Sequence, residues 1–283
     1  MSYYILDGKH CADTQLKHLK KTIENSPTVK RPGLAVIQVG NHSASNIYVN
    51  NKRRACQKVG IQTFDYDLKE STTEQALINQ VQTLNSHEDV HGILIQLPLP
   101  SHINEQNILE TIKPEKDVDG FHPYNIGRLA QKKPTLQPCT PLGIKMLLDF
   151  YGLKLDGLHT VIVGASNIVG RPAALNCLLA NATVTVCHKA TTNLAWHVQN
   201  ADCLIVAIGN PNVIQASWIK SGAIIIDVGI NRTENGGIIG DVPFKAASAR
   251  AEWITPVPGG VGPMTVAALM HNTWQAFQQQ LQR

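Results

Sequence analysis

Short apolar runs alternate with stretches of helical periodicity along the whole chain. In the first half, runs at 33–39, 62–67 and 90–96 predict strands, and the apolar spacing at about 43–58 and 73–85 predicts helices between them. The second half repeats this rhythm, with predicted strands at 160–163, 183–187, 203–207, 223–228 and 253–255. Several of these runs are apolar on both faces, which is typical of parallel strands covered by helices on each side. The pattern predicts an α/β fold.

The periodic pattern gives way between 117 and 140 to a connection rich in proline, glycine and lysine. We place a domain boundary there, because 283 residues suffice for about two domains of ordinary size. The predicted domains are residues 1–137 and residues 138–262. The closing segment, 263–283, predicts one long helix with Pro263 in its first turn, and we expect it to pack back on the first domain.

Composition excludes several classes of protein. Charged residues make up 16% of the chain and hydrophobic residues 43%, and this composition is too apolar for a disordered protein. No run approaches the ~18 consecutive apolar residues of a membrane helix. The net charge of +4 comes from scattered basic residues, so we expect no nucleic-acid-binding face and no membrane partner. Six cysteines without a C-x-x-C pair, and an opening without a secretory signal pattern, favour a reducing cytoplasm. The histidines lack ligand-like spacing and there is no P-loop sequence, so we expect neither a metal site nor P-loop ATP chemistry.

The most informative motif, at 161–172, is a strand that enters a glycine turn and then a helix. Backbone N–H groups at a helix start bind phosphate, so Gly164, Ala165 and Ser166 are candidate dinucleotide contacts. Ser166 stands where G-x-G-x-x-G has its second glycine, and Gly170 comes one residue late. A simple tight turn is therefore the alternative.

The end of the next predicted strand bears on cofactor choice. An NAD site usually has Asp or Glu about 20 residues after the first glycine, whereas this chain has His188 and Lys189. A cation there can pair with a 2′-phosphate, which favours NADP over NAD. A solvated lysine at a strand end is the alternative.

A possible catalytic group lies in the first domain. Tyr48, Lys52 and Cys56 have the spacing i, i+4, i+8 of one helix face. A lysine held out of water there could move a proton or polarise a bound group. A lysine followed by Arg53 and Arg54 is, however, more often part of a solvated helix surface.

Further candidates lie at strand ends and in turns. Gln96 ends a buried strand, where open α/β sheets bind ligands, so it could contact a substrate or Lys52, or be satisfied by local backbone. A carboxylate of the segment 117–123, which contains Asp117 and Asp119, could hold a heterocyclic amidine such as a pterin, or form an Asx turn before Gly120. Cys139 is interpreted as a packed small residue near a site. The glycine-rich segment 258–262 suits either close backbone approach to a ligand or a rigid hinge.

Seven segments, taken in chain order, carry a resemblance: Tyr48-Val-x-x-Lys52, Gly92-Ile-Leu-Ile-Gln96-Leu-Pro-Leu-Pro100, Lys116-Asp-Val-Asp-Gly120, Pro138-Cys-Thr-Pro141, Gly164-Ala-Ser-Asn-Ile-Val-Gly-Arg-Pro172, Asp227-Val-Gly-Ile-Asn231 and Pro256-Val-Pro-Gly-Gly-Val-Gly-Pro-Met-Thr265. Together they resemble the bifunctional methylenetetrahydrofolate dehydrogenase/methenyltetrahydrofolate cyclohydrolase family over nearly the whole chain.

The resemblance implies two reactions in one cleft between the domains. NADP-dependent oxidation of 5,10-methylenetetrahydrofolate gives the 5,10-methenyl cation, and its hydrolysis gives 10-formyltetrahydrofolate. It also implies an N-terminal folate-binding catalytic domain, a Rossmann-type NADP-binding domain, and a homodimer formed through the latter.

The same resemblance implies residue roles. Lys52 would be the principal catalytic residue, because an ammonium beside a cationic substrate gives up its proton more readily and can act as a base. Gln96 would hydrogen-bond Lys52, Tyr48 would pack against the folate, and Asp119 would hold the pterin. The other implied contacts are Leu97, Pro258, Gly259, Gly260, Val261 and Gly262 for folate, and Gly164, Ala165, Ser166, Lys189 and Ile230 for NADP.

Two other functions compete. An amino-acid or shikimate-type NADP-dependent dehydrogenase also joins a substrate domain to a nucleotide domain, but it has no use for Gln96 or for the 258–262 segment. A dinucleotide-sensing regulator would need a segment that binds a partner or nucleic acid, and we find no such segment in the sequence.

Overall fold

The computed structural model of the chain describes residues 3–40 and 43–282, with the side chains of 43–47 left out. The chain forms two compact units, one of Met1–Ala12 with Thr140–Thr265 and the other of Asp13–Cys139 with Val266–Arg283. The prediction placed all of residues 1–137 in one domain. The first twelve residues belong instead to the other unit, because strand β1 (Tyr4–Ile5) pairs with β11 (Trp253–Ile254).

The unit that contains Thr140–Thr265, here the six-stranded unit, is built on one sheet in the order β1-β11-β8-β7-β5-β6. All neighbouring strands are parallel. Its other strands are β5 (His159–Val163), β6 (Thr183–Cys187), β7 (Cys203–Val206) and β8 (Ile224–Asp227). A separate hairpin joins β9 (Asn231–Arg232) to β10 (Ile238–Ile239).

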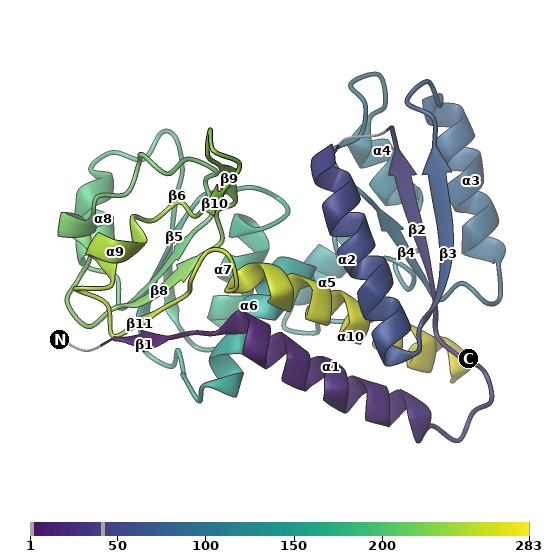
Figure 1. Cartoon of the computed structure of the whole chain (residues 1–283), viewed down its shortest axis with the longest axis horizontal. Coiled ribbons are helices and arrows are strands. Elements are labelled where there is room, and N and C mark those ends of the chain that lie inside the picture. Colours follow the sequence, from purple (N-terminus) through teal and green to yellow (C-terminus); the bar gives the residue numbers. More distant parts are fainter. Residues whose placement is uncertain (1–2, 41–42, 283) are drawn as a thin grey trace. The chain divides into compact units, whose positions relative to one another are not determined.

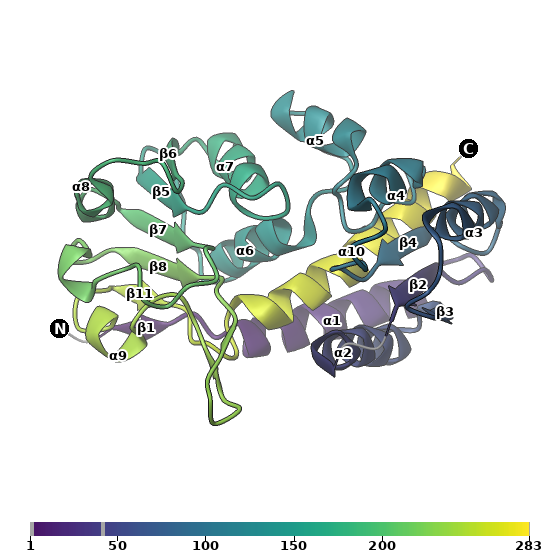
Figure 2. The same cartoon turned by 90° about the horizontal axis from the view of Figure 1, so that it is seen from above.

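Helices cover both faces of this sheet (Figure 2). The helices α6 (Cys139–Phe150) and α7 (Gly170–Leu179) lie on one face. The other face packs against α8 (Leu194–Gln199), the 3-10 turn η1 (Ala216–Trp218) and α9 (Phe244–Ala247). Alternate β5 residues therefore enter two apolar layers, with Val161 and Val163 facing α8.

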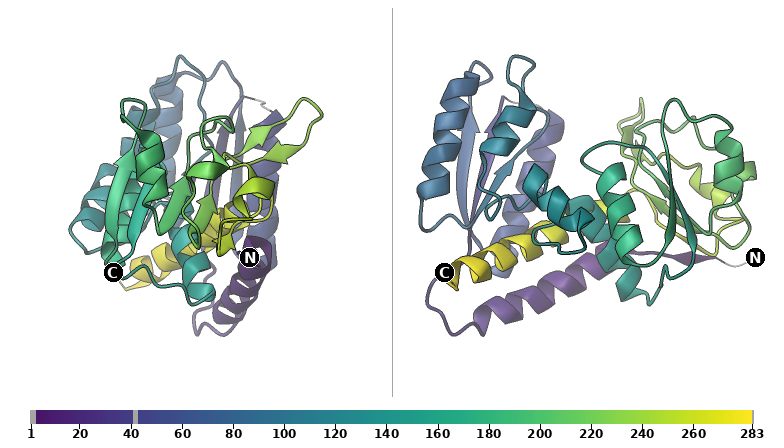
Figure 3. Two further views of the ribbon diagram at one scale, coloured as in Figure 1. Left: turned by 90° about the vertical axis from the view of Figure 1, so that its left-hand side faces the viewer. Right: turned by 180° about the vertical axis from the view of Figure 1, so that it is seen from behind.

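The second unit, here the three-stranded unit, has β2 (Gly33–Val39) between β3 (Gln62–Leu68) and β4 (Gly92–Ile95), all parallel. Helices α3 (Glu74–Ser86) and α4 (Glu105–Thr111) cover one face, and α2 (Ser43–Val59) covers the other (Figures 1 and 3). Strand β2 is buried along its whole length, as expected for a mostly apolar central strand of a parallel sheet, and this includes its one polar residue, Gln38.

The predicted α/β class is confirmed, and all eight predicted strands are present with ends within two residues of those expected. The helix expected at 263–282 is α10 (Val261–Leu281), and from Val266 onward it belongs to the three-stranded unit. The predicted helix ranges do not include α1 (Gly8–Glu24) or α5 (Pro123–Ala130), nor do they include α4, α6, α8 and α9. Within the described ranges, none of the helices has both the length and the apolar character needed to cross a membrane.

Candidate active site

Helix α2 presents Tyr48, Lys52 and Cys56 along one face, as their spacing predicts. Cys56 is fully buried, with its Sγ 3.6 Å from the Sδ of Met270 on α10. Tyr48 and Lys52 lie nearer the N-terminal end of α2 and are half-buried. The face that anchors the helix at Cys56 therefore carries a phenol and an ammonium at its partly exposed end.

Lys52 is held by Gln96. The Lys52 Nζ donates a 3.1 Å hydrogen bond to the Gln96 Oε1. Gln96 directly follows β4, and its backbone N–H donates to the Ile37 carbonyl at 2.8 Å. Its side-chain Nε2 donates to the Leu97 carbonyl at 2.7 Å, which fixes the amide with its oxygen toward the lysine. Both interpretations of Gln96 therefore hold, one for each end of the amide.

The turn before helix α5 is organised by Asp117, not by Asp119. The Asp117 carboxylate accepts the backbone N–H groups of Gly120 at 3.1 Å and His122 at 2.8 Å, and the Asn125 Nδ2 at 2.9 Å. Asp117 thus forms the turn before Gly120 that was the alternative for this segment. Burial raises the pKa of Asp119, and the nearby positive charge of Lys52 acts in the opposite direction. Asp119 is therefore electrostatically coupled to the Lys52 group.

Cys139 is a structural thiol in this unit. Its Sγ donates to the Val118 carbonyl at 3.2 Å, and burial raises its pKa well above the usual thiol value. Asn272 on α10 holds the same segment, with its Nδ2 donating to the carbonyls of Val118 at 2.8 Å and Gln137 at 2.7 Å. Sequence reasoning missed Asn272; its only signal is a polar residue among the apolar positions of the closing helix.

The glycine turn after β5 has the close packing that a phosphate-binding turn requires. Gly164 has φ +119°, and a side chain there would overlap the Ala207 carbonyl, while one at Gly170 would overlap the Gly164 carbonyl. The Ser166 Oγ accepts the N–H groups of Val169 at 3.2 Å and Gly170 at 3.4 Å. Its own hydroxyl proton remains able to donate to an anion at the start of α7.

Lys189 lies in the turn that follows the neighbouring strand β6. The Gly164 N–H donates to the Cys187 carbonyl at 2.9 Å, so the glycine turn and the 188–191 turn leave the sheet side by side. The His188 N–H donates to the Thr191 Oγ1 at 2.8 Å, and Lys189 is exposed between them. The turn, the helix start and this ammonium form a chemical set that fits a dinucleotide with a 2′-phosphate.

Two buried aspartates hold the strand ends beside Ile230, and sequence reasoning assigned neither a role. The Asp227 carboxylate accepts the backbone N–H groups of Asp241 at 2.9 Å and Val242 at 2.8 Å. The Asp241 Oδ2 accepts those of Ile208 at 2.7 Å and Gly209 at 2.9 Å, beyond the end of β7. Burial raises the pKa of Asp227 to about 6. The sequence signal that could have identified Asp227 is its place at the end of a buried strand, as the first residue of the 227–231 motif.

These two carboxylates fit because glycines face them. A side chain at Gly229 would overlap the Asp241 carboxylate, and one at Gly240 would overlap that of Asp227. Ile230, which lies between them in the chain, is 48% exposed, so the carboxylates support an accessible apolar side chain.

The predicted site residues divide between the units. Tyr48, Lys52, Gln96, Leu97 and Asp119 belong to the three-stranded unit. The six-stranded unit contains Pro258, Gly259, Gly260, Val261 and Gly262, as well as Gly164, Ala165, Ser166, Lys189 and Ile230. The Gly259 carbonyl accepts the Lys9 N–H at 2.9 Å, which ties the 258–262 segment to the start of α1. A role for this segment in a folate site stays a prediction.

The six-stranded unit has a parallel sheet with a dinucleotide-type glycine turn, and the three-stranded unit has a lysine–glutamine pair. This combination defines a two-domain dehydrogenase of the nucleotide-dependent class. Residues 6–119 match the family described as "Tetrahydrofolate dehydrogenase/cyclohydrolase, catalytic domain", and residues 138–281 match "Tetrahydrofolate dehydrogenase/cyclohydrolase, NAD(P)-binding domain". The chain belongs to the tetrahydrofolate dehydrogenase/cyclohydrolase family.

Solved structures of similar proteins match this chain over nearly its full length. The bifunctional enzyme FolD, a methylenetetrahydrofolate dehydrogenase/cyclohydrolase from Campylobacter jejuni, is 46% identical with a TM-score of 0.96, covering 98% of this chain and 100% of that one. A 5,10-methylenetetrahydrofolate dehydrogenase from the silkworm Bombyx mori is 42% identical, with a TM-score of 0.94 and full coverage of both chains. The Trypanosoma brucei enzyme, complexed with NADP and an inhibitor, is 37% identical with a TM-score of 0.95 and full coverage of both chains.

The predicted family, NADP cofactor and pair of activities are confirmed by these comparisons. The chain is a bifunctional methylenetetrahydrofolate dehydrogenase and methenyltetrahydrofolate cyclohydrolase. A shikimate dehydrogenase from Peptoclostridium difficile is similar in fold alone, at 13% identity and a TM-score of 0.52, so the alternative dehydrogenase is not favoured.

Proposed function

We propose that Lys52 carries the proton transfer of the cyclohydrolase reaction and that Gln96 sets its position. The supporting observation is the 3.1 Å hydrogen bond from the Lys52 Nζ to the Gln96 Oε1. Gln96 offers only an acceptor to the lysine, because its amide nitrogen is engaged by the Leu97 carbonyl. The lysine nitrogen is therefore held at one point and keeps its remaining donor or lone-pair positions for substrate and water.

The chemistry balances as follows. Loss of a hydride from the methylene carbon leaves the 5,10-methenyl cation, and bound NADP supplies the hydride acceptor. Water then adds to the methenyl carbon while Lys52 accepts a proton from that water. The C–N5 bond breaks, a proton goes to N5, and the carbon remains on N10 as a formyl group. Hydride transfer needs no side-chain acid, so the chain's part in that step is to position the reactants and exclude water.

Asp119 and Tyr48 bind the folate in this proposal. Asp119 accepts paired N–H donors from the pterin amidine, a pairing to which a carboxylate is suited. The turn before α5 is held by Asp117 and does not use the Asp119 carboxylate. Tyr48, one helical turn before Lys52, packs against the folate ring. Leu97 and the 258–262 segment complete the folate contacts.

The cofactor is held by the six-stranded unit. Gly164, Ala165 and Ser166 meet its phosphates at the start of α7, and Ile230 lies by the nicotinamide half. Lys189 pairs with the 2′-phosphate; its exposed place beside the glycine turn supports this assignment.

The chain also forms a homodimer through the six-stranded unit and acts in the cytoplasm in this proposal, without nucleic-acid partners. Adjacent isoleucines on β10, Ile238 at 41% and Ile239 at 43% exposed, support an apolar contact there. All six cysteines are buried and free, which suits a reducing compartment.

One assay tests the site. Purified protein is given 5,10-methylenetetrahydrofolate with NADP or NAD, and reduced cofactor and methenyl species are followed together. Wild-type protein should form NADPH without accumulating methenyl product. A Lys52→Met variant should accumulate it, and normal methenyl hydrolysis by that variant would remove Lys52 from the proposed role.

A further inference from the structure

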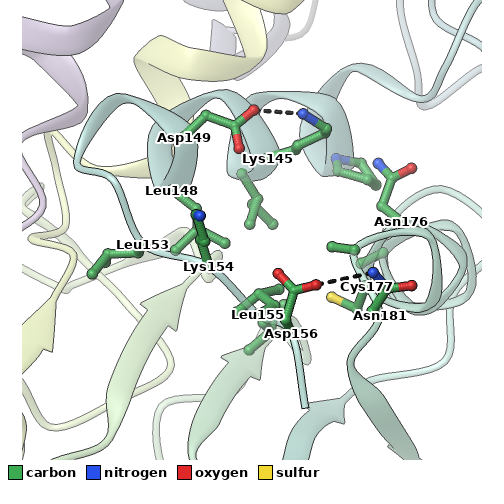
Figure 4. Close-up of a pocket in the computed structure, with 15 residues that line it drawn as sticks. Lys145, Leu148, Asp149, Leu153, Lys154, Leu155, Asp156, Asn176, Cys177 and Asn181 are labelled. Carbon is green, nitrogen blue, oxygen red and sulfur yellow. Dashed lines mark hydrogen bonds and ion pairs between the residues drawn. The ribbon is translucent and has the colours of Figure 1, made fainter. Parts of the chain in front are cut away.

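The six-stranded unit contains a cavity between α6 and α7 (Figure 4). Its volume is about 150 Å³, and its walls are the buried side chains of Ile144, Leu148, Leu155, Ala173 and Ile205. An apolar space of this size can hold one aromatic ring. On α7 the lining residues begin at Ala173, so they lie beyond the glycine turn and the first residues of the helix.

One polar side chain in this wall is without a partner. Asn176 is 6% exposed, and neither its Nδ2 nor its Oδ1 has a hydrogen-bond partner among the residues that the structure describes. Leaving both buried amide atoms unpaired is unfavourable, and an apolar residue of similar size would avoid it. A ligand that enters the cavity and offers Asn176 both an acceptor and a donor would satisfy the two amide atoms.

The charges at the rim limit what that ligand can be. The Lys145 ammonium pairs with the Asp149 carboxylate on α6, and the Asn181 Nδ2 donates to the Asp156 Oδ1 at 2.9 Å on the α7 side. Lys154 is exposed to solvent at the rim. The two lysines at the rim, Lys145 and Lys154, balance the charges of Asp149 and Asp156. Because the rim has no net charge and the walls are apolar, a neutral ligand suits the cavity better than an ion.

We propose that this cavity is a binding site for a small, neutral, planar molecule that carries a carboxamide or lactam edge. The ring occupies the apolar space between α6 and α7, and the edge pairs with both atoms of the Asn176 amide. The site is separate from the proposed nucleotide contacts, and the proposal does not depend on the roles assigned to Lys52 or Lys189.

Benzamide is a suitable probe, with toluene as its apolar match and benzoate as its charged match. The full-length protein is first saturated with NADP, so that benzamide cannot enter a nicotinamide site. Binding is followed by methyl NMR of Ile144, Leu148 and Leu155, whose side chains line this cavity. Benzamide should shift these methyl signals, and it should bind at least about tenfold more tightly than toluene because it satisfies the amide.

Substitution of Asn176 isolates the contribution of its hydrogen bonds to benzamide, because each variant is compared with wild type for both benzamide and toluene. In Asn176→Leu, benzamide should lose about tenfold or more in affinity, while toluene should bind as well as before or better. Asn25→Leu, an exposed asparagine change in the other unit, should leave both affinities unchanged. Asn176→Asp keeps a polar side chain of the same size, and it should also bind benzamide less tightly because the amide donor is lost.

Three results would overturn the proposal. The first is equal affinity of benzamide and toluene for wild-type protein, which would mean that water alone satisfies Asn176. The second is tighter binding of benzoate, which would make the site one for anions paired with Lys154. The third is an absence of shifts at the three methyl positions at saturating benzamide. None of these results would bear on the dehydrogenase or cyclohydrolase assay.

Discussion

The Lys52 ammonium and the Gln96 amide form a 3.1 Å hydrogen bond that joins α2 to the end of β4. Both groups come from elements anchored in the core, Lys52 one helical turn before the buried Cys56 and Gln96 directly after the buried Ile95. Side chains held by rigid elements keep their geometry when a substrate binds, which is what a proton-transferring group requires.

Lys52→Met should lower methenyl hydrolysis by about 10²–10⁴-fold, the usual contribution of one general acid or base. NADP affinity should be unchanged, because the proposed cofactor contacts lie in the other unit. Stopped-flow measurement of methenyl decay checks the first point and fluorescence titration of the cofactor the second. Lys58→Met, on the same helix but exposed and paired with Asp13, is the matched control and should retain both properties.

Asp119→Ala should raise the KM for folate by about 10–100-fold, the equivalent of one lost charge-assisted contact, with little change in the KM for NADP. Asp119→Asn should recover part of this effect, because its amide keeps one acceptor. Steady-state kinetics with each substrate varied in turn separates the two constants. Unchanged folate kinetics in both variants would place Asp119 outside the folate site.

Lys189→Ala should weaken NADP binding by about 1–3 kcal/mol and hardly affect NAD, because only NADP has the 2′-phosphate. Isothermal titration with both cofactors measures the difference directly. Lys245→Ala, an exposed lysine on α9, is the control for a general loss of positive charge. Equal losses for NADP and NAD would show that Lys189 does not contact the 2′-phosphate.

Much of the fold could be predicted because parallel strands such as β5 are short, mostly apolar runs with sharp ends. The pairing of β1 could not, because Tyr4–Ile5 is a two-residue strand whose partner lies at the other end of the chain. Helix α5 was not predicted because the prolines and glycines around it indicate a loop. Pro123 nevertheless occupies its first turn, where proline is favoured, and the His122 ring caps the helix.

The candidate site likewise contains residues that local sequence predicts and residues that only long-range contacts reveal. Local spacing was enough to place Lys52 on one helix face, and the strand end was enough to place Gln96. Asp241 and Asn272 act through contacts with segments far away in sequence, Ile208–Gly209 and Val118. No periodic pattern records such contacts, so only the folded chain identifies them.

Asp241→Asn should separate the two activities. An amide at this position cannot accept from Ile208, Gly209 and the Asn231 Nδ2 at once, so the strand ends beside Ile230 should loosen. We expect the KM for NADP to rise by roughly tenfold, the effect of about one lost hydrogen bond to a charged group. Methenyl hydrolysis, which uses no nicotinamide, serves as the internal control and should be unchanged. A parallel fall in both activities would indicate general unfolding instead.

His91 and Asp227 should give stability two opposing dependences on pH. The His91 Nδ1 accepts the Gly33 N–H at 3.0 Å, and burial with the nearby Lys116 charge lowers the pKa of His91 to about 4. The unfolded chain then binds more protons than the folded one between about pH 4 and 6.5, so the contribution of His91 to stability is lost as the pH falls through this window. For Asp227, whose folded pKa is about 6, the folded chain binds more protons, and stability is lost as the pH rises from about 4 to 6.

Each shift corresponds to about 3 kcal/mol, so the two effects largely cancel in the wild-type protein. Substitution of either residue should therefore expose the other. Urea unfolding of His91→Asn, which keeps an acceptor for Gly33, should show stability that falls relative to wild type as the pH rises from 4 to 6. Asp227→Asn should show the reverse slope. Parallel curves for wild type and His91→Asn would contradict the burial argument, because a ring that titrates alike in both states contributes no slope.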